Sequence, residues 1–144
     1  APTLLDIAGS DTPEYMQGRS FKEILETGEE PDEWPKSTYY RYWMHMMHHA
    51  NPAHFGIRDK DYKLIFYYGS DLHGKKRTPA GWELYDIKND PDELHNLYGE
   101  PKYQEIVATL KDELIALRDS LNETDTAYPE IQKIITDHWS DRGS

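Results

Sequence analysis

From residue 37 the sequence repeats with a period of two residues, which predicts the first strand of a sheet. Successive side chains of a strand point to opposite faces, so residues of equal parity within 37–46 share a face. One face would carry Tyr40, Tyr42, Met44 and Met46, and the other Tyr39, Arg41, Trp43 and His45. We expect the first set to be the core side.

Three more segments have strand character. Residues 55–58 and 62–68 are two β-like runs joined by the polar link Asp59-Lys60-Asp61. In the second run, large apolar residues at even positions alternate with Lys63, Ile65 and Tyr67. This pattern predicts a hairpin in an antiparallel sheet. The segment GWELYDI, residues 81–87, predicts another short strand.

Apolar residues recur at helical spacing between residues 101 and 121, with Pro101 at the start and charges on the opposite face. They are Tyr103, Ile106, Val107, Leu110, Leu114, Leu117 and Leu121. A second, shorter helix is expected after Pro129. An amphipathic helix must cover something apolar, and the sheet is the obvious target. The two layers make an α+β unit.

The segment NDPDELHNL, residues 89–97, carries the signals of a helix start. Asp90 would cap a helical turn, Pro91 suits its first position, and Glu93 would complete a capping box. We expect this turn to direct Leu94 and Leu97 toward the sheet.

Residues 1–36 differ from the rest of the chain. The segment TLLDIAG resembles the last turns of a helix closed by Gly9, and its beginning would lie upstream of residue 1. Prolines and glycines interrupt residues 10–36, where ETGEEPDEWP is typical of an acidic connecting loop. Phe21, Ile24 and Leu25 could share one short helical turn between them.

Charge and composition limit the possible partners. Sixteen basic and 27 acidic residues give a net charge of −11, which has the wrong sign for binding a phosphate backbone. We therefore expect no nucleic-acid partner. No stretch approaches the roughly 18 apolar residues that a membrane span requires, so no membrane partner is expected either. Because the chain has no cysteine, disulfides and thiolate metal sites are excluded.

Four histidines fall within ten residues: His45, His48, His49 and His54. Were residues 45–49 helical, the first three would share a face and could bind zinc. Because no carboxylate or thiolate completes the set, the sequence favours histidines that are hydrogen-bonded to the backbone at a strand end or loop. A third interpretation is that the imidazoles contact an anionic or hydroxylated ligand, since Asn51-Pro52 forces a loop and loops on rigid sheets often carry function.

Several segments in order point to one family. APTLLDIAG, MQGRSF, PAHFGIRDKDYKLI and WELYDIKNDPDELHNL precede the long amphipathic helix. In this combination the chain resembles the C-terminal portion of a type I sulfatase, of the kind that acts on sulfated sugars or glycosaminoglycans. The resemblance implies a large α/β domain with the active site, followed by an antiparallel sheet of about four strands packed on a helix. Residues 1–36 would be the end of a large-domain helix and a connecting loop, and residues 37–144 the C-terminal α+β subdomain.

The resemblance places the chemistry outside this segment. In such enzymes a Cys or Ser becomes formylglycine, whose hydrate attacks sulfur beside a bound calcium ion in the large domain. Here there is no cysteine, and Ser37, which precedes Arg41 at the family spacing, is followed by Tyr39 where the family has a small residue or proline. We expect no catalytic residue, metal or cofactor in this segment, which alone should be inactive. The implied partners are the N-terminal sulfatase domain of the same protein and a sulfated saccharide, in a periplasmic, secreted or lysosomal setting.

Substrate recognition is the role that the resemblance leaves to this chain. The loop HHANPAHFG would border the cleft, and we carry over His54, then His48 and His49, as contacts to the sugar or leaving group. An alternative is an independent carbohydrate- or metal-binding module that uses the His45–His54 cluster. A third possibility is a structural covering domain without ligand contact.

Overall fold

The computed structural model describes residues 1–47, 49–75 and 77–141, and the chain divides into two compact units, Ala1–Pro35 and Lys36–Ser144. The first unit contains two short helices, α1 (Pro2–Ile7) and α2 (Lys22–Thr27). The Ser20 hydroxyl donates to the Asp6 carboxylate at 2.6 Å, and the Phe21 amide donates to the Thr3 hydroxyl at 3.2 Å. These bonds hold the segment before α2 against α1.

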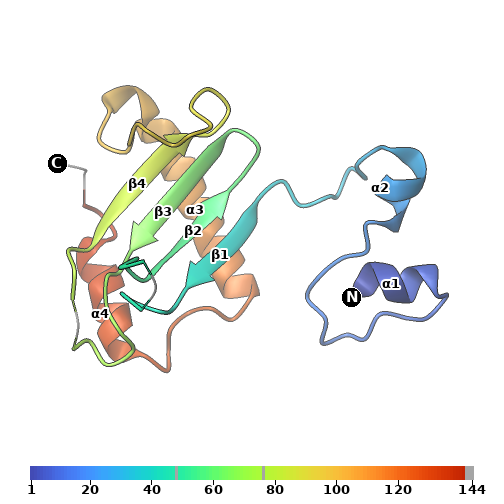
Figure 1. Cartoon of the computed structure of the whole chain (residues 1–144), viewed down its shortest axis with the longest axis horizontal. Helices are drawn as coiled ribbons and strands as arrows, with labels where there is room; N and C mark the ends of the chain where they lie inside the picture. Colours follow the sequence, from blue (N-terminus) through green and yellow to red (C-terminus); the bar gives the residue numbers. More distant parts are fainter. Residues whose placement is uncertain (48, 76, 142–144) are drawn as a thin grey trace. The chain divides into compact units, whose positions relative to one another are not determined.

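The second unit is a four-stranded sheet with a helix across one face (Figure 1). Its strands are β1 (Thr38–Tyr42), β2 (His54–Arg58), β3 (Tyr62–Tyr67) and β4 (Gly81–Asp86), antiparallel and in the order β1-β2-β3-β4. A 3-10 turn, η1 (Pro101–Tyr103), leads into α3 (Gln104–Ser120), and α4 (Pro129–His138) follows. This arrangement confirms the predicted α+β fold, the hairpin and both helices.

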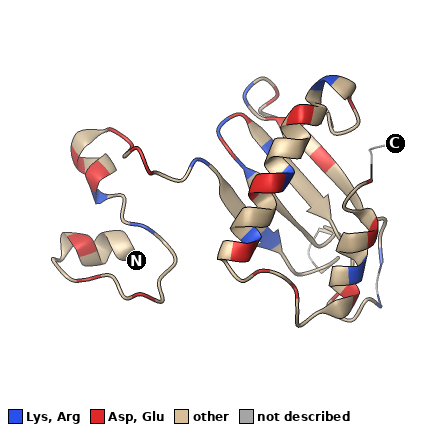
Figure 2. Cartoon of the chain, turned by 180° about the vertical axis from the view of Figure 1, so that it is seen from behind, with Lys and Arg blue, Asp and Glu red and all other residues tan. Residues whose placement is uncertain are grey.

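The core lies between the sheet and α3, as the reverse view in Figure 2 makes visible. Alternate residues of β2, β3 and β4 point toward the helix and are fully or nearly fully buried. They are Phe55, Ile57, Leu64, Phe66, Trp82 and Leu84, which pack with Val107, Leu110 and Leu114 of α3 and with Ile131 and Ile134 of α4. Burying each such side chain contributes roughly 1.5–3 kcal/mol.

The predicted orientation of the first strand is wrong. Tyr39 and Trp43 pack against the core, whereas Met44 and Met46 are 46% and 40% exposed. The strand also ends at Tyr42, and turns occupy residues 45–47. The alternation therefore does not continue through residue 46. The core-facing side of this strand also includes a charged residue, Arg41, whose partner Asp125 lies far along the chain.

A turn forms at residues 90–93 as predicted, with the Glu93 amide donating to the Asp90 carbonyl at 3.0 Å, but the predicted capping box is wrong. Residues 91–92 form only a turn, and Glu93 has a left-handed backbone with φ of 54°. Its carboxylate pairs with Lys63 Nζ at 2.5 Å and so does not serve a capping box. Leu94 is 73% exposed, contrary to expectation, while Leu97 packs partly against the core as expected.

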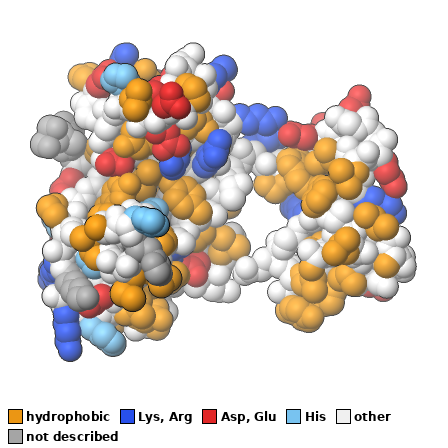
Figure 3. Space-filling model, viewed as in Figure 1, with side chains coloured by type: hydrophobic (Ala, Val, Ile, Leu, Met, Phe, Trp, Pro, Cys, Tyr) orange, Lys and Arg blue, Asp and Glu red, His pale blue; other side chains and the backbone are white. Residues whose placement is uncertain are grey.

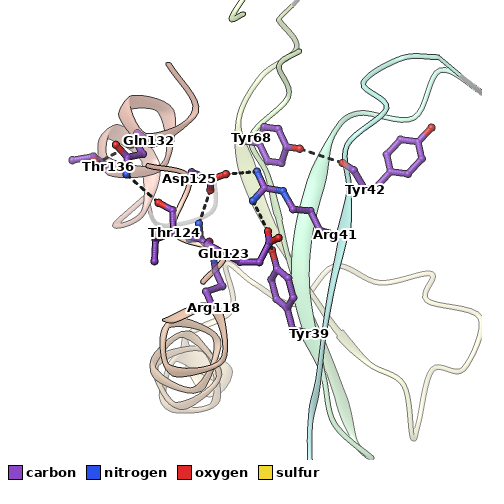
Figure 4. Close-up of polar contacts among 10 residues, drawn as sticks. All are labelled: Tyr39, Arg41, Tyr42, Tyr68, Arg118, Glu123, Thr124, Asp125, Gln132 and Thr136. Carbon is purple, nitrogen blue, oxygen red and sulfur yellow. Dashed lines mark hydrogen bonds and ion pairs between the residues drawn. The ribbon is translucent and has the colours of Figure 1, made fainter. Parts of the chain in front are cut away.

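A buried network of charges joins β1, α3 and the segment before α4 (Figure 4). Asp125 Oδ2 accepts a hydrogen bond from Arg118 Nη2 at 2.6 Å, and Asp125 Oδ1 forms an ion pair with Arg41 Nη2 at 2.7 Å. The Asp125 side chain is 1% exposed. Arg41 Nη1 also lies 3.1 Å from Glu123 Oε2, and its guanidinium stacks 3.4 Å above the Trp43 ring. Burial opposes the charge of Arg41, but the hydrogen bond and charge of Asp125 outweigh it and keep the pKa above its usual value.

The end of α4 is held by a lysine among aromatic rings. Lys111 of α3 donates from Nζ to the Trp139 carbonyl at 2.5 Å and to the Tyr98 hydroxyl at 2.8 Å. The ammonium lies 4.1 Å from the centre of the Trp82 ring, a cation–π contact. Burial lowers the pKa of Lys111 to about 8. The helix is thus fixed at one end by this cluster and at the other by the Asp125 network.

Replacing Asp125 by alanine should strongly destabilise the fold. Asp125→Ala leaves two buried guanidinium groups without their shared carboxylate, a change that typically costs about 3–5 kcal/mol. Urea unfolding of the chain measures the loss. The matched control is Asp137→Ala, which removes an exposed pair with Lys133 and should cost no more than about 1 kcal/mol. Equal losses in the two variants would contradict a structural role for the network.

Alkaline pH should destabilise the fold through its tyrosines. Burial raises the pKa of Tyr39, Tyr85 and Tyr98 from 10.0 to about 12. The unfolded chain therefore loses these protons at lower pH than the folded chain, so the free energy of unfolding falls as pH rises from about 10 to about 12. Urea unfolding at several pH values gives the slope. Tyr98→Phe should make it shallower, whereas Tyr15→Phe, at an 81% exposed position, should not.

Candidate functional site

The face of the sheet opposite α3 carries a row of rings. The antiparallel register places Tyr42 of β1, His54 of β2 and Tyr67 of β3 side by side. The ring centre of His54 lies 5.5 Å from that of Tyr42 and 5.1 Å from that of Tyr67. Figure 4 shows Tyr42 on the side of the sheet away from α3, whereas Arg41 points to the helix side. His54 therefore stands in the middle of an aromatic row.

A glycine allows a further ring to join this surface. Tyr40 of β1 lies opposite Gly56 of β2, and an added Cβ on Gly56 would come within 2.6 Å of the Tyr40 hydroxyl oxygen. The tyrosine ring thus crosses β2 where no side chain stands, and its centre lies 6.1 Å from that of His54. Any side chain at residue 56 would displace it.

The orientation of His54 is fixed by the backbone. Its Nδ1 lies 2.8 Å from the Pro52 carbonyl oxygen. A carbonyl can only accept a hydrogen bond, so Nδ1 must carry the proton. In the neutral ring, Nε2 is then the acceptor, and in the charged ring it is a second donor. A half-buried imidazole held in this way can bind either a hydroxyl group or an anion.

The loop before His54 is organised around a buried histidine. His45 is 4% exposed, and its Nδ1 accepts the Ala53 amide hydrogen at 3.2 Å. The Met46 amide donates to the Asn51 carbonyl at 2.9 Å and closes the loop. This geometry agrees with the interpretation of a histidine hydrogen-bonded to the backbone. Residues 45–47 and 49–50 form turns, so the helix that a zinc site on His45 would need is not formed.

Of the other two candidate histidines, His49 lies in this loop. His48 lies outside the described residues. His49 is exposed and has a left-handed backbone with φ of 56°, as do Met46 at 57° and Ala50 at 53°. Non-glycine residues in this conformation cost energy and cluster at functional loops. The structure thus brings neither His45 nor His49 into the ring row, where His54 stands with its aromatic neighbours.

A hollow of about 440 Å³ adjoins the ring row. It is lined by Pro52, Tyr67, Thr78, Pro79, Ala80, Gly81, Trp82, Glu83 and Asn96. Pro52 and Tyr67 connect it directly to His54 through the contacts above. Glu83 accepts a hydrogen bond from the Tyr85 hydroxyl at 3.0 Å. Burial, and then the negative charge of Glu83, raise the pKa of Tyr67, so its hydroxyl stays protonated at neutral pH.

The described residues offer no site for a metal ion: nowhere among them do three His, Cys, Asp or Glu side chains gather in a way that could hold one. Arg41, which follows Ser37 at the sulfatase spacing, is committed to its ion pair with Asp125 on the core side. In the same part of the chain no helix is long and apolar enough to cross a membrane.

Comparison with known proteins identifies the family. The sequence matches, over residues 1–120, the model of the family described as N-sulphoglucosamine sulphohydrolase, C-terminal. The chain belongs to this family. An N-acetylglucosamine-6-O-sulfatase of Bacteroides thetaiotaomicron is 39% identical over 131 residues, which are 90% of this chain and 21% of that protein. The chain thus spans about a fifth of the length of this sulfatase.

Solved structures extend the comparison. One, a complex with its substrate D-glucosamine-2-N,6-O-disulfate, is 35% identical with a TM-score of 0.77, over 86% of this chain and 24% of that one. Another, a 2-O GAG sulfatase, is 26% identical with a TM-score of 0.59, over 89% of this chain and 25% of that one. The resemblance to the C-terminal portion of sulfatases is therefore confirmed. The four-stranded sheet with its helix is the fold of the C-terminal subdomain in these relatives.

Sequence reasoning did not find the neighbours of His54. Tyr42 was expected on the core side, and neither Tyr67 nor Glu83 was singled out. One signal could have found Tyr67: a hairpin centred between Lys60 and Asp61 places residue 67 opposite residue 54. No local pattern marks Glu83, which reaches the site because β4 pairs with β3.

Removing the His45 imidazole should loosen the loop before His54. His45→Ala leaves the buried Ala53 amide without its acceptor, which should lower the opening free energy there by about 1–3 kcal/mol. Hydrogen exchange of the Ala53 amide measures this. His45→Asn, whose side-chain oxygen stands near the position of Nδ1, should restore part of the protection. His49→Ala, at an exposed position, should leave the exchange rate unchanged, and an equal effect of both alanine variants would contradict the anchoring role.

Proposed function

We propose that this chain is the C-terminal subdomain of a sulfatase that hydrolyses sulfate esters of sugars, and that it supplies substrate recognition and structural support. The observation that carries the proposal is the family match over residues 1–120, with 39% identity to an N-acetylglucosamine-6-O-sulfatase. The substrate named for the solved relative, D-glucosamine-2-N,6-O-disulfate, makes a sulfated amino sugar the first candidate ligand.

His54 is the residue proposed to contact the sugar or its leaving group. Its ring is oriented by the Pro52 carbonyl and flanked by Tyr42 and Tyr67, so little conformational entropy is lost when Nε2 binds a ligand. His48 and His49 are proposed as further contacts from the loop. The exposed position of His49 at the loop tip supports its part in this.

The reacting groups are proposed to lie in an N-terminal sulfatase domain of the same protein, which would provide formylglycine and calcium. This chain has no cysteine, and its described residues do not fit a calcium ion, so neither group is assigned here. Residues 1–36 would be the end of a large-domain helix and a connecting loop, and residues 37–144 the subdomain. Leu4, Ile7 and Leu25 in the first unit are 72%, 57% and 63% exposed. Figure 3 shows hydrophobic side chains on the surface of this unit, as expected of a surface that a larger domain covers.

A second candidate function is an independent carbohydrate-binding module. The aromatic row around His54 favours it, because rings of this kind stack on sugars without any catalytic partner. The metal-binding form of this alternative is weaker, since His45 turns its Nδ1 to the Ala53 amide.

Replacing His54 should weaken turnover of the sugar substrate in the complete protein. Losing one hydrogen bond to a charged group costs about 1.5–3 kcal/mol. His54→Ala should therefore lower kcat/KM for D-glucosamine-2-N,6-O-disulfate by roughly 10- to 150-fold. A small aryl sulfate, which lacks the sugar, should be turned over at a nearly unchanged rate.

His73→Ala, at an exposed position outside the ring row, is the control and should change neither rate. Unchanged sugar turnover in His54→Ala would favour a structural covering domain. Sulfatase activity of the 144-residue chain by itself would contradict the proposed division between recognition and chemistry.

A further inference from the structure

The ring row beside His54 ends in an open position. In the sheet register, Tyr42, His54 and Tyr67 are followed by Gly81 of β4. An added Cβ on Gly81 would meet no other heavy atom within 4 Å. The place where a fourth side chain would stand is therefore empty space, and it opens into the hollow of about 440 Å³. This volume lies within the roughly 300–1,000 Å³ of small-molecule sites.

The lining of the hollow is chemically selective. Of its nine lining residues, Glu83 is the one that carries a charge. Tyr67 contributes aromatic surface, and Thr78 and Asn96 contribute polar groups. Asn96 is committed to the backbone, because its side-chain oxygen accepts from the amides of residues 84 and 98 at 3.1 and 3.0 Å. Glu83 is thus the principal group that can recognise a ligand.

Glu83 is held in place by a neighbour. The Tyr85 hydroxyl donates to Glu83 Oε2 at 3.0 Å. A carboxylate has about four acceptor positions, so this one donor leaves room for the hydroxyl groups of a ligand. The same negative charge repels a sulfate or carboxylate group. A carboxylate beside aromatic rings suits a ligand that offers hydroxyl donors and C–H faces.

We propose that this hollow binds an uncharged pyranose ring, next to the sulfated sugar at His54, and that Glu83 disfavours a second anionic group there. The inference rests on the proposed function for the identity of the neighbouring sugar. Pro52 and Tyr67 are shared by the hollow and by the surroundings of His54, so the two rings would be adjacent units of one saccharide. The substrate class is then an oligosaccharide whose sulfated unit is joined to an uncharged one.

Two variants separate the hollow from the rest of the site. Gly81→Val places a β-branched side chain, which suits a strand, into space that no atom occupies, so the fold should be retained. Glu83→Gln keeps the size of the side chain and removes its charge. Thermal unfolding of both variants checks that the sheet is intact before binding is compared.

Binding is measured by NMR titration of the full 144-residue chain with a methyl galactopyranoside and with its 6-sulfate. The uncharged probe should shift the backbone amide signals of residues 81 and 83, and Gly81→Val should abolish these shifts. The sulfated probe should bind the hollow about fivefold more weakly, the effect of one unit charge repelling another in water, and Glu83→Gln should remove that difference. No shift at residues 81 and 83 with the uncharged probe, or shifts that persist in Gly81→Val, would overturn the inference.

His54→Ala distinguishes this inference from the proposed function. It should leave the response of the hollow to the uncharged probe unchanged, so a failure of the His54 proposal would not affect this result. In the complete protein, Gly81→Val should lower kcat/KM for a disaccharide with one sulfated and one uncharged unit by about tenfold, and leave turnover of the sulfated monosaccharide unchanged. Equal effects of Gly81→Val on both substrates would contradict a separate subsite.

Discussion

The second unit depends on one buried carboxylate shared by two arginines. Asp125, 1% exposed at its side chain, binds Arg41 of β1 at 2.7 Å and Arg118 of α3 at 2.6 Å. β1 is an edge strand and has a neighbour on one side only, so its hydrogen bonds to β2 are supplemented by this link to the helix layer. The same carboxylate fixes the start of the segment that leads to α4. Edge strand, main helix and terminal helix are therefore positioned by a single charged group.

The proposed recognition surface is the other side of the same strands. Alternation that directs Arg41, Phe55 and Phe66 to the core directs Tyr42, His54 and Tyr67 to the opposite face. A shift of one residue in register would exchange the two sets, which makes the core packing the device that holds His54 between its rings. Gly56 and Gly81 then shape this surface by leaving space, in one case for Tyr40 and in the other for the hollow.

Most of the fold could be predicted from the sequence, because the hairpin at residues 55–68 and the long helix have strong local patterns. Which face of β1 points to the core could not be predicted. A charged residue on the core side is stable only with a buried partner, and Arg41 finds Asp125 in a loop that no periodicity connects to it. Leu94 was misplaced for a related reason, since Glu93 pairs with Lys63 across the turn and prevents the capping box. For the site, the sequence indicated His54 and its loop, whereas Tyr67 and Glu83 reach it only through strand pairing.

Because of the charge of the chain, the proposed binding of a sulfated sugar must rely on short-range contacts. A net charge of −11 gives no general attraction for an anion. Exposed charges are screened beyond about 8 Å at physiological ionic strength, so distant acidic groups neither guide nor strongly repel the ligand. The acidic residues of α3, Glu105, Asp112, Glu113 and Asp119, face solvent on the helix side of the sheet, away from His54 (Figure 2). An oriented imidazole is then well suited to the sulfated unit, and the single carboxylate of Glu83, within reach of the neighbouring ring, is close enough for its charge to discriminate.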